Sequence, residues 1–299
     1  MAKIRDTFGD RVFSYVNHFL VFVLFAAVLY PLIYVLSCSI SSPIEVAAGR
    51  VWLWPKGITL LGYQRVFQEP GILTGYKNTL IYTIVGTLLN LVVTVPAGYA
   101  LAKRSLPGRN IIMGFFMFTM YFSGGLIPTF LLVNSLGLYN TRMVLIILGA
   151  FSMYNCIICR TFFAGIPRDI EEAAAIDGCS HTRTFIQIVL PISQALLGVM
   201  VLYFAVSHWN SYFSALIYIS DESLKPLQLI LRKILVQEAS NAAMMEGRPT
   251  GDDYAFQQHQ LRELIKYSVI VVASLPVMIL YPFLQKYFVK GVMIGSVKG

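Results

Sequence analysis

Long apolar stretches alternate with shorter polar segments along the whole chain. An α-helix rises about 1.5 Å per residue, so roughly 20 apolar residues are needed to cross about 30 Å of hydrocarbon. The pattern therefore predicts an all-α polytopic membrane protein with six transmembrane helices. The predicted spans are residues 15–37, 78–102, 111–133, 143–163, 193–219 and 267–284.

Prolines lie within or at the ends of several predicted spans. Each proline lacks a backbone donor, so we expect bent or locally irregular helices at these positions. Such bends suit a protein with a solute pathway, but they also occur in membrane proteins that have none. The prolines are Pro31, Pro96, Pro128, Pro276 and Pro282.

The first apolar stretch begins after basic residues and runs into Cys38, so its ends resemble those of a lipoprotein signal peptide. The apolar run is too long for a signal sequence, and five further spans follow it. We interpret it as a retained helix that follows a short N-terminal segment, residues 1–14. Cleavage as a lipoprotein is the alternative.

The short loops between the spans differ in charge. Six spans place both termini on one side of the membrane. The loop of residues 103–110 contains three basic residues, whereas the opposing short loop of residues 134–142 contains Arg142 alone. Because basic residues are enriched in cytoplasmic loops, we predict cytoplasmic termini and an extracytoplasmic loop at residues 220–266. The interpretation is one multi-pass domain, residues 15–299, in a bacterial plasma membrane.

The composition supports the membrane class. Hydrophobic residues make up 57% of the 299 residues and charged residues 13%, about half the charged share of a soluble domain. Lysines and arginines that border spans account for the net charge of +8, so no nucleic-acid partner is expected. The four cysteines and four histidines show no metal-ligand spacing, and neither a metal site nor a catalytic site is predicted.

The chain lacks the usual devices that supply energy for transport. It contains no G-x-x-x-x-G-K-[ST] motif for nucleotide phosphates. The predicted spans hold almost none of the charged residues expected for ion coupling, and His208 is the ionisable residue that lies well inside one. If this chain transports a solute, the energy must come from another subunit.

Residues 167–191 form a polar, alanine-rich segment between two apolar stretches. Three acids fall in its first turns, where the helix dipole favours negative charge, and Gly178 is suited to end the helix. Ser180 or Thr182 would cap a second helix. The residues alone leave two interpretations, a re-entrant elbow on the membrane surface and a docking helix for a partner protein.

The spacing E-A-A, three residues, G, nine residues, I-x-L-P within this segment resembles the cytoplasmic signature of permease subunits of binding-protein-dependent ABC importers. The flanking R-T-F-F at residues 160–163 is similar to the carbohydrate-importer branch, which includes the maltose-importer permeases. F-S-G-G-L-I-P at residues 122–128 and K-Y-F-V-K-G at residues 286–291 resemble the subfamily for complex or acidic oligosaccharides in Gram-positive bacteria. The resemblance covers essentially the whole chain.

The resemblance implies that residues 167–191 contain a coupling helix docked on an ATPase, with cationic groups of the ATPase against Glu171 or Glu172. It also implies a homologous second permease, two copies of the ATPase subunit, an extracytoplasmic solute-binding protein and an oligosaccharide substrate. ATP and Mg would bind to the ATPase. This chain would bind no cofactor and would not itself be an enzyme. The implied coupling residues are Glu171, Glu172, Ala173, Ala174, Asp177, Gly178, Ile188, Leu190 and Pro191.

Candidate sugar contacts come from residue chemistry, because aromatic faces with neighbouring amides or hydroxyls suit carbohydrates. Aromatic residues in spans more often pack or mark interfaces. The candidates are Trp209, Asn210 and Tyr212 in the fifth span, with Tyr121, Tyr154, Asn155 and Tyr203. By family analogy, the contacts with the binding protein would be Met244, Met245, Gly247, Arg248 and Tyr254 in the last outer loop.

Two other functions compete with an importer permease. A secondary transporter or channel subunit for small polar solutes is opposed by the scarcity of charge within the spans. A membrane-embedded enzyme would need a cluster of acids or histidines at one membrane face, and the acid cluster of this chain lies on the predicted docking helix. Co-purification of an ATPase and a second permease would separate the importer from both alternatives.

Overall fold

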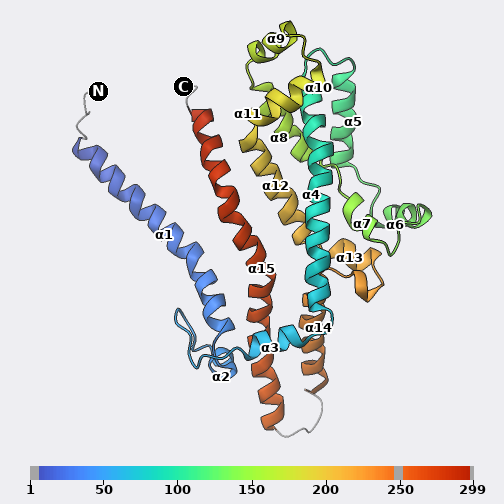
Figure 1. Cartoon of the computed structure of the whole chain (residues 1–299). Coiled ribbons are helices and arrows are strands. Elements are labelled where there is room, and N and C mark those ends of the chain that lie inside the picture. Colours follow the sequence, from blue (N-terminus) through green and yellow to red (C-terminus); the bar gives the residue numbers. More distant parts are fainter. Residues whose placement is uncertain (1–6, 246–251, 297–299) are drawn as a thin grey trace. The chain divides into compact units, whose positions relative to one another are not determined.

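The computed structural model describes residues 7–245 and 252–296, which form helices and turns without a β-strand (Figure 1). The all-α prediction is therefore confirmed for the described residues. A π-helical turn, η1 (Phe185–Val189), and a 3₁₀ turn, η2 (Glu222–Leu224), accompany the α-helices. The α-helices are α1 (Phe8–Ser39), α2 (Pro43–Ala47), α3 (Leu61–Gln68), α4 (Ile72–Ala102), α5 (Arg109–Tyr121), α6 (Leu126–Ser135), α7 (Arg142–Ile147), α8 (Met153–Ala164), α9 (Arg168–Ile176), α10 (His181–Thr184), α11 (Leu190–Ile192), α12 (Gln194–Trp209), α13 (Phe213–Tyr218), α14 (Leu227–Met245) and α15 (Asp252–Ser296).

Three described helices are long and apolar enough to cross a membrane: α1, α4 and the part His259–Phe283 of α15. Two further crossings are possible if sharply bent pairs count as one span each. These pairs are α5 with α6, at 111°, and His181–Ile192 with α12, at 84°. The six predicted spans are not confirmed by this number, and the third, fourth and fifth predicted spans are each divided into two helices.

Glycines mark two of the breaks within the predicted spans. Gly125, between α5 and α6, and Gly149, between α7 and α8, have φ angles of +86° and +98°, a conformation that a side chain disfavours. The break between α12 and α13 follows the C-cap residue Asn210. Helices α1, α4 and α15 stay helical through Pro31, Pro96, Pro276 and Pro282, whereas Pro128 lies in the first turn of α6, directly after one of the breaks.

The chain divides into two compact units, Met1–Pro70 with Leu231–Ser274, and Gly71–Ile230 with Leu275–Gly299. Buried Cys38, Val46, Val51 and Leu264 form the core of the first unit. The prediction of one membrane domain over residues 15–299 concerns the embedded protein and stays a prediction.

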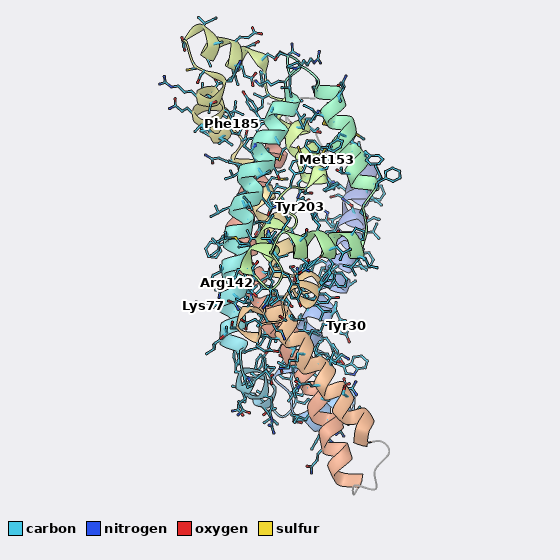
Figure 2. All side chains as sticks on the ribbon, turned by 90° about the vertical axis from the view of Figure 1, so that its right-hand side faces the viewer. Tyr30, Lys77, Arg142, Met153, Phe185 and Tyr203 are labelled. Atoms are coloured by element: carbon cyan, nitrogen blue, oxygen red, sulfur yellow. The ribbon has the colours of Figure 1, made fainter. Side chains whose placement is uncertain are left out.

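Helix α4 is the centre of the second unit and packs mainly against α8 and α12. Lys77 lies near one end of α4 and Phe185 beside the other, with Tyr203 between them (Figure 2). Residues four apart share one helix face, and on α4 this face carries polar or small side chains. They are Asn78, Tyr82, Gly86, Asn90, Thr94 and Gly98. Small residues allow helix backbones to approach closely.

Asn90 joins three elements of the second unit. Its Nδ2 donates to the carbonyl oxygen of Gly149 at 2.7 Å, and its Oδ1 lies 2.8 Å from His208 Nε2. The contact with Gly149 satisfies a carbonyl that the break between α7 and α8 leaves without a helical partner. A Cβ atom on Gly86 would lie 2.4 Å from the His208 ring. Gly86 therefore provides the space in which His208 reaches Asn90.

Replacing Gly86 by alanine is expected to destabilise the protein by roughly 2–4 kcal/mol, because the methyl group displaces His208 and breaks a buried hydrogen bond. Gly114→Ala is the matched control, since a Cβ atom there meets nothing within 4 Å. Thermal unfolding of the two variants in detergent measures the difference. Equal melting temperatures would show that His208 needs no space at Gly86.

Candidate functional site

Helix α9 and the turn that follows it form a polar part of the second unit. The helix begins after Pro167 and ends at a glycine turn. The Gly178 N–H donates to the Ala175 carbonyl, and the Cys179 N–H donates to the Ala174 carbonyl at 2.9 Å. These two bonds form a Schellman motif with Gly178 at a φ of +75°. The predicted end of the helix at Gly178 is thus confirmed, and Ser180 caps α10 by accepting from the Arg183 N–H.

The two faces of α9 differ in exposure. Ala174 is 3% exposed and turns toward the rest of the second unit. Glu172 and Ala173 are exposed, and Ile176 is 87% exposed. Glu172 and Ile176 are four residues apart and share the outer face. The outer face of α9 therefore combines a large exposed aliphatic side chain with a carboxylate.

Glu171 attaches α9 to the end of α4. Its carboxylate forms an ion pair with Lys103 and accepts a hydrogen bond from the Tyr99 hydroxyl at 3.1 Å. The Lys103 ammonium lies 4.3 Å from the centre of the Tyr99 ring, within the range of a cation–π interaction. We call Tyr99, Lys103 and Glu171 the α4–α9 clamp. About a quarter of the Lys103 and Glu171 side chains is exposed, so the pair is partly shielded from water.

Tyr99 also connects the clamp to the apolar core. Its ring stacks on Phe185 at 4.7 Å and meets Phe163 edge-on at 5.5 Å. Burial lowers the pKa of Lys103, but the hydrogen bonds with Glu171 and Tyr99 outweigh it and raise that pKa above its ordinary value. The Lys103 ammonium therefore stays charged throughout the neutral pH range. One cluster thus joins α4, α8, α9 and η1.

The chain returns from α10 to α12 through a π-helical turn. Residues 185–189 are π-helical, and the Leu190 N–H donates to the Phe185 carbonyl. A proline ring clashes with the carbonyl four residues before it in a regular α-helix. The widened turn gives Pro191 room. Ser193 then ends the segment, and α12 starts at an angle of 84° to it.

The expected coupling residues lie on consecutive elements of the second unit. Those from 171 to 178 lie on α9 and its turn, Ile188 is in η1, and Leu190 and Pro191 are in α11. The cationic partner of Glu171 is found within the chain, so the expected contact with a cation of the ATPase rests on Glu172. Sequence reasoning missed Tyr99 and Lys103. Their i, i+4 spacing at the polar end of an apolar helix is the signal that could have identified them.

The expected sugar contacts lie on several elements of the second unit and differ in exposure. Trp209 is 3% exposed, and its ring centre lies 6.4 Å from that of Tyr76. The other aromatic candidates are at least two-fifths exposed, and Asn210 is exposed, whereas Asn155 is half-buried. Except for Tyr203, the candidates border the three helix breaks. They are Tyr121 at the end of α5, Tyr154 and Asn155 at the start of α8, and Trp209, Asn210 and Tyr212 between α12 and α13.

The expected contacts with a binding protein fall at the edge of the described chain. Gly247 and Arg248 lie outside the described residues. Met244 and Met245 end α14, and Tyr254 lies in the first turn of α15. Their side chains are outside the described part, so this expectation stays a prediction.

Comparison with known proteins gives matches over nearly the full chain. A family model described as "binding-protein-dependent transport system inner membrane component" matches residues 70–294. The chain is 39% identical over 302 residues to the protein LplC of Bacillus subtilis strain 168, with all of both chains covered. It is 38% identical over 269 residues to the polygalacturonan/rhamnogalacturonan transport system permease protein YtcP of the same strain, with 90% of this chain and 92% of YtcP covered.

A solved structure matches as well. It is the crystal structure of a bacterial ABC transporter involved in the import of the acidic polysaccharide alginate. The match has a TM-score of 0.79 and 33% sequence identity, and it covers 96% of this chain and 100% of the other.

Proposed function

The chain belongs to the family of inner membrane components of binding-protein-dependent transport systems. We propose that this permease subunit couples ATP hydrolysis on its ATPase to the import of an acidic oligosaccharide. As an ABC importer permease, it is part of a membrane-embedded complex with a partner permease, an ATPase and a binding protein. The proposal adds two copies of the ATPase subunit, which bind ATP and Mg, and a homologous partner permease.

Helix α9 is the proposed coupling helix. The observation that supports it most strongly is the outer face, where Ile176 is 87% exposed beside exposed Glu172. An apolar side chain fits a cleft of a partner, and a carboxylate fits a cation at the rim of that cleft. The glycine turn at Gly178 ends α9 and returns the chain to the membrane.

The α4–α9 clamp is the proposed link between the coupling helix and the spans. A helix of nine residues is too short to be stable alone, so contacts with its own subunit must hold it. The ion pair and the hydrogen bond of Glu171 join α9 to the end of the longest apolar helix of the second unit. A movement of the ATPase against α9 would thus pass to α4 as a rigid-body movement.

Six crossings with both termini in the cytoplasm remain the proposed topology. In this proposal α7 with α8 forms the fourth crossing and α12 with α13 the fifth, each with a break in its path. Irregular backbone within a bilayer must be buried in protein or line an aqueous cavity. The three breaks, and the aromatic residues that border them, are therefore proposed to face the sugar pathway and the second permease.

The substrate class is proposed from the relatives. YtcP is named for the transport of polygalacturonan and rhamnogalacturonan, and the matched structure is a transporter involved in the import of alginate. These three polysaccharides are all acidic. We propose that the substrate of this chain is an oligosaccharide that carries carboxylates. The outer-loop residues Met244, Met245, Gly247, Arg248 and Tyr254 are proposed to face the binding protein that delivers it.

Reconstitution of the complete complex tests this function. The permease, co-purified with its ATPase and second permease, is placed in proteoliposomes with the cognate binding protein, and ATP hydrolysis is measured. We expect acidic oligosaccharides to stimulate hydrolysis at least tenfold more than neutral maltooligosaccharides of the same length. Equal or stronger stimulation by the neutral sugars would refute the acidic substrate, and absence of a co-purifying ATPase would refute the coupling proposal.

A further inference from the structure

Residues 49–60 of the first unit form a loop with an exposed apolar surface. Trp52 is 69% exposed, Trp54 81% and Ile58 77%, and Leu53 and Leu60 are each about half exposed. Large exposed apolar surfaces normally face a partner or a membrane. The loop lies between α2 and α3, outside the proposed coupling site and the helix breaks.

Hydrogen bonds fix the position of this loop along α1. The Ser37 hydroxyl donates to the Leu53 carbonyl at 2.6 Å, and the Thr59 N–H donates to the Ile40 carbonyl at 3.0 Å. Ser37 lies in the last turn of α1, which ends at Ser39. The apolar window of α1 has none of its residues buried within the chain, as expected of a helix that faces lipid. The loop is therefore level with the end of a lipid-facing span.

The loop also presents cations beside its tryptophans. Gly49, Arg50, Trp52, Leu53, Trp54 and Lys56 line an open hollow of about 460 Å³. Arg50 pairs with Glu45 at 2.9 Å, and Lys56 is exposed. Tryptophans gather where hydrocarbon gives way to headgroups, and lysine or arginine at that depth attracts lipid phosphates. The exposed residues thus combine the two chemistries of the membrane interface.

We propose that this hollow seats the phosphate headgroup of a phospholipid, with Trp52 and Trp54 at the boundary of the acyl chains and Lys56 at the phosphate. Continuity with the lipid-facing surface of α1 favours a lipid over a protein or a saccharide as the occupant. The loop then fixes the depth of the first unit in the bilayer. This inference rests on the membrane location of α1 and is independent of the proposed substrate and coupling helix.

Nitroxide labels in the purified complex, reconstituted into bilayers, test the depth. Trp52→Cys and Trp54→Cys are made in a Cys179→Ser background, since the other three cysteines are buried. Labels at Phe22, an exposed position within α1, and at exposed Asp221 serve as lipid and water references.

We expect relaxation by oxygen to exceed relaxation by a nickel chelate at positions 52 and 54, with values between the two references. Nickel access equal to that at Asp221 would place the loop in water. Low access to both reagents would place it under another protein. Either result would overturn the proposal.

Bound lipid is the second measurement. The intact complex is mixed with phosphatidylglycerol, and the retained lipid is counted by native mass spectrometry. The Arg50→Gln and Lys56→Gln double variant is expected to retain roughly fivefold less lipid than the wild type. Arg65→Gln, which removes an exposed cation on α3, is the control and should retain it. Equal lipid retention in the wild type, the double variant and Arg65→Gln would overturn the headgroup site.

Galacturonate oligomers are added to the nitroxide-labelled complex as a further test. If they immobilise the label at position 54, a saccharide is the occupant and the lipid proposal is overturned.

Discussion

Lys103→Met is expected to lower substrate-stimulated ATP hydrolysis of the reconstituted complex about tenfold, while the complex still assembles. The substitution keeps the length of the apolar stem and removes the ammonium that pairs with Glu171. A partly buried carboxylate then lacks its ionic partner, which costs about 1–3 kcal/mol. If α9 exchanges between a position attached to α4 and a detached one, a loss of about 1.4 kcal/mol lowers the equilibrium constant for attachment tenfold. ATPase assays in proteoliposomes measure the loss.

Charge reversal separates a positioning role of the clamp from a general loss of stability. Glu171→Gln should resemble Lys103→Met, and the double variant Lys103→Glu with Glu171→Lys should recover most of the stimulation. Arg104→Met is the matched control, because it removes the neighbouring exposed cation. Full stimulation in Lys103→Met would contradict the clamp. A double variant as impaired as both single variants would show that the ion pair itself is not what positions α9.

Ile176→Asp is expected to prevent stable association of the ATPase, with at least tenfold less ATPase recovered with the purified permease. Ile176 is 87% exposed in the single chain, so the substitution removes no contact within it. In the proposed complex the side chain enters a cleft, where its burial contributes about 1.5–3 kcal/mol and a carboxylate is unfavourable. The ratio of ATPase to permease after affinity purification measures the effect, and Glu172→Lys should act in the same direction.

Thr182→Asp is the control for Ile176→Asp, since it adds the same charge at an exposed position beyond the glycine turn. Both variants should insert into the membrane and show the same thermal stability as the wild-type chain. A normal ratio of ATPase to permease in Ile176→Asp would place the docking surface elsewhere on the subunit.

The sequence was sufficient to predict the helical class, because apolar runs of membrane length are a strong signal. It was not sufficient to predict which runs would form continuous helices. Gly149 lies in a run of apolar residues, and the break there is stabilised because the Asn90 side chain on α4 donates a hydrogen bond to the freed Gly149 carbonyl. Nothing near Gly149 in the sequence indicates that contact, so the break depends on tertiary structure.

The candidate site was predicted in part. The glycine turn and the capping serine follow from local rules of helix ends, and both were found in the sequence. Local rules could not distinguish the roles of Glu171 and Glu172, which are adjacent and chemically alike. The helix turns about 100° between them, so Glu171 reaches Lys103 and Glu172 is left exposed.

The π-helical turn before Pro191 has a consequence for the length of the segment between Gly178 and the membrane. Each residue of a helix advances the direction of the chain by about 100°. Inserting one residue into α10, which is α-helical, would turn α9 by about that angle relative to the π-helical turn and point Glu172 and Ile176 away from their present direction. The nine residues between Gly178 and Ile188 therefore act as a register, and their number matters more than their identity.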